Sequence, residues 1–151
     1  MDQTFEIIRT SRKLTSQFLD NYSLEQLNKI PEGFSNNLIW NIAHVVVTQQ
    51  ILVYKLSGLP MIVSDGFVEK YRKGTKPEGD ISQEELEEIK SLLFETIIKT
   101  EADYNAKVFN TYNEFTTSLG FTFKNAEDAI IYNNYHEALH FGVMMSIRKF
   151  I

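Results

Sequence analysis

Residues 36–58 have the sequence NNLIWNIAHVVVTQQILVYKLSG, and their apolar positions recur at the spacing of an α-helix. One stripe of this helix comprises Trp40, His44, Val47, Ile51 and Tyr54. We expect the helix to run from about Asn36 to Ser57 and to end at Gly58, because glycine readily adopts the left-handed conformation found after helix C-termini. An apolar stripe of this length needs partner elements to bury it.

Three further segments show the same helical period, and convincing strand alternation is absent from the chain. They predict a first helix from about Gln3 to Asn21, a third from Ser82 to about Lys107, and a fourth that begins at Asn125. Ser82 with Glu85 has the form of a capping box.

Two other helix starts are predicted from local capping residues. The sequence SLEQ at residues 23–26 has the form of a capping box and indicates a short turn of helix after the first one. Ser35 is expected to cap the helix of residues 36–57, because serine is a preferred residue at the N-terminus of a helix.

The connections between the helices are of unequal length. Residues 58–80 hold two of the three prolines and four of the seven glycines, so we expect a long irregular connection. It reaches up to about 75 Å when extended, which would let the helices on either side run parallel. Residues 108–123, VFNTYNEFTTSLGFTF, form a second, aromatic connection with room for a short extended piece. We predict an all-α protein: a four-helix bundle, residues 1–151 as one domain, with long connections between helices 2 and 3 and between helices 3 and 4.

Charge and composition exclude several classes of function. The net charge of −5 disfavours a nucleic-acid partner, since binding phosphate requires a basic surface. No apolar run approaches the roughly 20 residues that span a bilayer, and the first residues lack the order of a signal peptide. The chain has no cysteine, which rules out thiolate ligands and disulfides and fits a cytoplasmic location. We therefore expect no membrane partner, and a thiol only if one is brought in by a co-substrate.

All three histidines, His44, His136 and His140, fall on helical stripes that would face the interior of a bundle. His136 and His140 are four residues apart, so their rings leave the same face of the last helix. Two interpretations stay open. The histidines are packed core residues, each needing a hydrogen-bond partner, or they are the ligands of a metal ion. Three imidazoles suit zinc, nickel, copper or iron(II) and leave coordination positions free for water or substrate.

The sequence HEALH at residues 136–140 matches the H-E-x-x-H pattern of zinc proteases. We do not expect a protease, because no further His, Asp or Glu follows His140 as a third ligand. Glu137 lies about 100° around the helix from His136 and is expected to be a surface carboxylate. A di-iron site is excluded because the paired Glu-x-x-His motifs it requires are missing.

Other polar residues lie close to the histidines in the sequence. Asn41, Asn133 and Tyr132 each lie three or four residues from a histidine and could orient a ring or a bound water, or could be polar positions near a bundle end. Arg12 interrupts the apolar stripe of the first helix. It could bind an anionic group of a substrate, but we expect it to reach a helix edge and extend its charged end into water.

The second helix, LIWNIAHVVVTQQILVYKLSG, and the last, YHEALHFGVMMSIRKFI, resemble those of the DinB/YfiT-like superfamily of metal-binding four-helix bundles. The shared motif is one histidine in helix 2 and H-x-x-x-H in helix 4 followed by a small residue, here His44, His136, His140 and Gly142. The resemblance implies a divalent metal, zinc or nickel, held by the three histidines, and a homodimer.

The same resemblance implies a small-molecule substrate. Some similar proteins are transferases or isomerases that use bacillithiol, mycothiol or glutathione. We therefore expect a metal-dependent thiol S-transferase or hydrolase, with a low-molecular-weight thiol as a possible co-substrate. The alternative is a metal- or ligand-binding stress-response bundle without catalysis.

Overall fold

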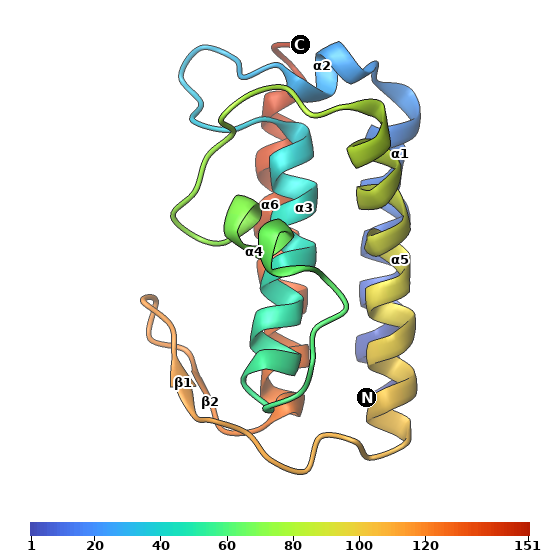
Figure 1. The fold of residues 1–151 in the computed structure, drawn as a ribbon, viewed down its shortest axis with the longest axis vertical. Coiled ribbons are helices and arrows are strands. Elements are labelled where there is room, and N and C mark those ends of the chain that lie inside the picture. The colour runs from blue at the N-terminus through green and yellow to red at the C-terminus, as the bar shows by residue number, and fades with distance from the viewer.

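The computed structural model describes residues 1–151 and consists mainly of helices, which confirms the all-α prediction. Four long helices form the bundle: α1 (Asp2–Asn21), α3 (Leu38–Gln50), α5 (Gln83–Asn105) and α6 (Ala126–Ile147) (Figure 1). The remaining elements are short: α2 (Leu24–Asn28), the π-helix η1 (Ile51–Lys55), α4 (Asp65–Tyr71), β1 (Phe115–Thr116) and β2 (Thr122–Phe123).

The bundle has parallel neighbours. α1 and α6 run in one direction, whereas α3 and α5 run in the other (Figure 1). α3 packs against both α5 and α6, and α1 packs against the same two helices. The chain between α3 and α5 must therefore return along the length of the bundle, as the length of this connection predicted.

Most helix starts lie where their capping residues predicted. Ser23 and Gln26 form the reciprocal capping box of α2, and the Asn125 side chain accepts the N–H of Asp128 at the start of α6. Ser82 caps α5 by accepting the N–H of Glu85, but the predicted capping box is only half formed, because the Glu85 carboxylate binds Lys70 and Tyr71 instead.

The predicted start of α3 is wrong. Asn37, not Ser35, is its N-cap: Asn37 Oδ1 accepts the N–H of Trp40 at 2.9 Å. The helix therefore begins at Leu38, two residues later than expected, because the Asn37 side chain satisfies a backbone donor that the helix itself leaves free.

The end of this helix also differs from a regular α-helix. Residues 51–55 form the π-helix η1, in which the N–H of Leu56 donates to the Ile51 carbonyl at 3.2 Å. Gly58 follows with φ of +71°, the left-handed conformation expected there. π-helical turns insert one residue and are frequent near functional sites.

The connection from residue 58 to 80 is not wholly irregular, and this prediction needs correction. It contains α4, whose start is capped by Ser64 and whose Phe67, Val68 and Tyr71 are buried. The second connection carries the short extended piece as a hairpin, with Phe115 opposite Phe123 in β1 and β2.

α3 lies at the centre of the molecule. Twelve of its thirteen residues are buried, since α5, α6 and α4 all pack against it. Thr48 is the one α3 residue that retains partial exposure. No helix of the structure has both the length and the apolar character that crossing a membrane requires.

Candidate metal centre

The fold brings all three histidines together. His44 projects from α3, and His136 and His140 project from successive turns of α6, the helix packed beside it. One ring nitrogen from each residue falls within a group whose members lie no more than 4.8 Å apart. The ring centroids of His136 and His140 are 4.6 Å apart, and that of His44 lies 5.3 and 4.7 Å from them.

The environment of His44 assigns its tautomer. Its Nδ1 lies 2.7 Å from the carbonyl oxygen of Tyr71, the last residue of α4. A carbonyl oxygen only accepts, so Nδ1 carries the proton and donates, and the lone pair is on Nε2, where it accepts a hydrogen bond from the Thr48 hydroxyl. The Thr48 hydroxyl lies 3.3 Å from this Nε2. α4, which sequence reasoning missed, thus orients a candidate ligand.

The tautomer of His140 follows from the amide of Asn41. Asn41 Nδ2 donates to Asn36 Oδ1 at 2.9 Å and to the Asn37 carbonyl at 2.6 Å, which fixes the orientation of the amide. Asn41 Oδ1 lies 2.8 Å from His140 Nδ1 and must accept its proton. The lone pair of His140 is therefore on Nε2 as well. Metal-binding histidines commonly donate their other nitrogen to a carboxylate, carbonyl or similar acceptor.

His136 has no such partner. Its Nδ1 is buried and makes no hydrogen bond, whereas a histidine that serves only packing would normally have its buried nitrogen satisfied. The ring of Tyr132 stacks beside it at a centroid distance of 6.3 Å. Asn133 donates to Glu137 at 2.6 Å rather than to a histidine. Of the three nearby polar residues that could orient a ring, only Asn41 makes a hydrogen bond to one.

Burial keeps the three rings neutral. Burial is the largest cause, and together with the neighbouring histidines it lowers the pKa of His136 to about 3 and that of His140 to about 4; Arg12 adds to the effect at His136. Burial also lowers the pKa of His44; the hydrogen bond to Tyr71 opposes this effect, and the charge of Lys73 adds to it. Neutral imidazoles are the form that binds metals, so no proton has to leave at neutral pH.

The expectations for Glu137 and Arg12 are both wrong. Glu137 is 3% exposed, and its Oε1 accepts from Arg12 Nε at 2.9 Å and from Nη2 at 2.7 Å. Arg12 is fully buried and also donates to the Leu93 carbonyl at 2.9 Å. The face of α6 that carries Glu137 packs against α1, so neither residue reaches water. Because Glu137 is held in this ion pair, it is not free to act as the general base of a zinc protease.

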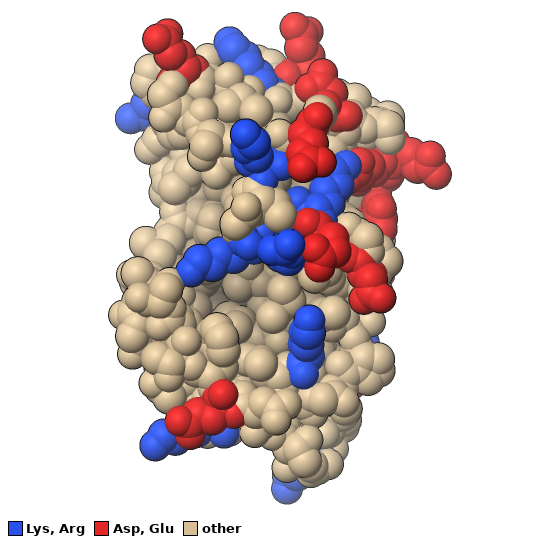
Figure 2. All heavy atoms as spheres, turned by 60° about the vertical axis from the view of Figure 1, so that its left-hand side comes forward, with Lys and Arg blue, Asp and Glu red and all other residues tan.

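A pocket of about 510 Å³ opens over the histidines. Its walls include Trp40 and Thr48 from α3, Leu139 from α6, and the tip of the hairpin around Leu119. Trp40 stacks on His44 with a centroid distance of 4.6 Å and an angle of 10° between the ring planes. Figure 2 shows this side of the molecule, where a hollowed region without acidic or basic atoms is bordered by basic side chains.

The donor set fits a divalent metal of borderline character. Three neutral nitrogens suit zinc or nickel, and no fourth His, Cys, Asp or Glu belongs to the group. The buried Nδ1 of His136 has no hydrogen-bond partner, and a metal ion bound at this nitrogen would supply one. The packing interpretation accounts for His44 and His140 but leaves this atom unexplained.

The molecule is thus a four-helix bundle that holds a three-histidine group, able to bind a metal ion, at the floor of an open pocket. The chain belongs to the DinB superfamily, whose family model matches residues 7–144. Its fold is similar to that in the "Crystal structure of the conserved protein of locus from Enterococcus faecalis", with a TM-score of 0.62 and 12% identity over 99% of this chain and 95% of that one. No curated protein matches the chain.

Proposed function

We propose that this protein is a metal-dependent enzyme that acts on a small molecule, either as a thiol S-transferase or as a hydrolase. The observation that carries the proposal is the position of the three histidines, which share one pocket with open space above them. A purely structural zinc site would take four protein ligands, whereas three leave a position for a substrate or water.

His44, His136 and His140 would hold the metal, with zinc or nickel as the expected ion. When bound, the metal would supply Lewis-acid chemistry, lowering the pKa of a thiol or water in the pocket. Tyr71 and Asn41 hold two of the ligands in the tautomer that this requires. Trp40 and Leu139 give the pocket apolar walls that hold the body of a substrate and limit access of water.

A second candidate is a bundle that binds a metal or small ligand without catalysis. One feature of the pocket favours this second candidate. No carboxylate lines the pocket, so no acidic side chain is positioned to act as a general acid or base. The two candidates differ in turnover, and both require the metal.

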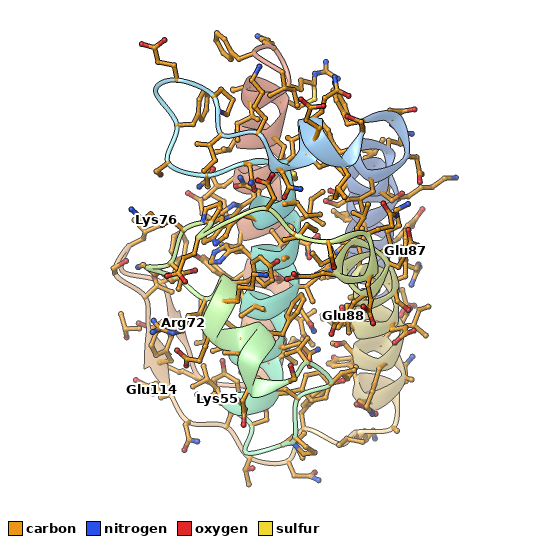
Figure 3. All side chains as sticks on the ribbon, turned by 45° about the horizontal axis from the view of Figure 1, so that its top comes forward. Lys55, Arg72, Lys76, Glu87, Glu88 and Glu114 are labelled. Atoms are coloured by element: carbon orange, nitrogen blue, oxygen red, sulfur yellow. The ribbon has the colours of Figure 1, made fainter.

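The first experiment is the metal content of untagged protein measured by mass spectrometry. We expect about one equivalent in the wild type and little in His44→Ala and His136→Ala, with circular dichroism showing that both variants stay helical. The matched control is Glu87→Gln/Glu88→Gln on α5, where exposed carboxylates could attract metal nonspecifically (Figure 3).

Loss of metal in the carboxylate control but not in the histidine variants would refute the site. A loaded protein is then assayed for transfer of a low-molecular-weight thiol to small electrophiles and for hydrolysis of small amides and esters. Metal binding without any turnover would favour the non-catalytic candidate.

A further inference from the structure

Lys73 is the one residue with a formal charge at neutral pH among those that line the pocket. It follows α4, and its Nζ donates to Ser118 Oγ at the tip of the hairpin, at 2.6 Å. Lys73 forms no ion pair in the structure. An ammonium group has three donors, so at least two stay available to a ligand.

The neighbouring basic residues are engaged differently. Lys70 pairs with Glu85 at 2.6 Å and Arg72 pairs with Glu69 at 2.8 Å. Lys76 is exposed and does not line the pocket over the histidines; it lies on the loop after α4 at the margin of the molecule (Figure 3). Lys73 therefore differs from its neighbours in being both unpaired and part of the pocket wall.

We propose that Lys73 recognises an anionic group on the ligand of this pocket, so that the substrate is a small molecule with an apolar body and an anionic end. This inference rests on the proposed function in taking the pocket as the substrate site. The apolar body would contact Trp40, Ile51, Leu52, Phe115, Leu119 and Leu139, which line the same space.

The charge balance of the pocket supports the sign of the ligand. With neutral histidines and no carboxylate, the lining carries a single positive charge, and a divalent metal would increase it. An anion thus meets no like charge, whereas a cation would be repelled by Lys73 and by the metal. Lys73 is itself exposed, so the attraction is of the size measured for ion pairs at a surface.

The chain supplies its own probe of occupancy. Trp40 is the single tryptophan, and it lines the pocket and stacks on His44. Quenching or shifting of its fluorescence therefore reports binding without any activity assay. We would titrate 3-phenylpropanoate and 3-phenylpropanol, which have similar bodies and differ in charge, into the wild type, Lys73→Gln and Lys76→Gln.

We expect the wild type to bind the carboxylate more tightly than the alcohol. Lys73→Gln should weaken binding of the carboxylate about fivefold, equivalent to about 1 kcal/mol, and leave the alcohol unchanged. Lys76→Gln changes the net charge equally and should alter neither. The proposal is overturned if the two lysine variants behave alike, if the alcohol binds as well as the carboxylate, or if neither ligand perturbs Trp40.

Each titration is run on the protein as purified and again after removal of metal by a chelator, because a carboxylate can also bind a metal directly. Selectivity for the anion that depends on Lys73 should persist without metal. Selectivity that vanishes with the metal would refute the role of Lys73 while leaving the metal site intact. Metal analysis of the same samples separates failure of this inference from failure of the proposed function.

Discussion

Removing only one partner of the buried ion pair between Arg12 and Glu137 should strongly destabilise the fold, and a single variant on either side tests this. Arg12→Met keeps the length of the side chain but leaves the Glu137 carboxylate with only the amide of Asn133 as a donor. Glu137→Leu leaves the guanidinium with the Leu93 carbonyl and a marginal contact to Thr96 at 3.5 Å. Each variant therefore leaves one buried charge without its ion-pair partner.

The expected loss is about 3–5 kcal/mol for each single variant, the usual cost of removing one partner of a buried pair. That is a large fraction of the roughly 5–15 kcal/mol by which domains are stable. The double variant Arg12→Met/Glu137→Leu removes both charges and should be much more stable than the sum of the two losses predicts. Urea denaturation followed by circular dichroism measures all four free energies of unfolding.

An internal control lies one helical turn away on α1. Arg9 forms an ion pair with Glu101 on α5, but its side chain is 45% exposed. Arg9→Met should therefore cost far less than Arg12→Met, although it removes the same kind of pair. The reasoning fails if Arg12→Met costs less than about 1 kcal/mol, or if the single losses add within about 0.5 kcal/mol in the double variant.

Three further predictions follow from local geometry. Asn41→Ala removes the acceptor that fixes the tautomer of His140 and should weaken zinc binding about 10- to 100-fold, measured by competition with a chelating dye. Asn37→Ala removes the N-cap of α3 and should cost about 1 kcal/mol in urea denaturation. Gly58→Ala should lower the free energy of unfolding by about 1–2 kcal/mol, because φ at this position is +71°. Gly142→Ala should raise it by about 0.5–1 kcal/mol in the same assay, because residue 142 lies inside α6 and no atom is within 4 Å of the added Cβ.

The helices could be predicted where their signals are local. The helical period and the capping residues Ser23, Ser82 and Asn125 act within a few positions of the chain, and the structure has them where expected. α4 was missed because seven residues are too few to establish a period and because glycines and prolines surround them. What holds it is burial of Phe67, Val68 and Tyr71 against α3, which is a tertiary effect.

In the candidate site, too, only the features set by local sequence could be predicted. The pairing of His136 with His140 follows from their spacing on one helix, whereas the approach of His44 depends on the packing of α3 on α6. The partner of His44 is a backbone carbonyl, and every residue has one, so nothing in the sequence distinguishes Tyr71. Lys73 reaches the pocket only because the chain returns past α3 after α4. The homodimer and the cytoplasmic location stay predictions.

Glu137 was misplaced because the last helix was given a single buried face. The face of α6 that carries the histidines packs against α3, and the adjacent face packs against α1. A residue 100° around the helix from His136, such as Glu137, is therefore buried against α1 and does not reach the surface. A signal for this was present. Arg12 interrupts an apolar stripe and needs a carboxylate if it is buried, and Glu137 is the only acidic residue between Ala129 and Ile147 of a mostly apolar helix. Opposite charges on the apolar stripe of the first helix and within the apolar stretch of the last would be explained by contact between these two helices, and that inference would have placed α1 against α6 from the sequence.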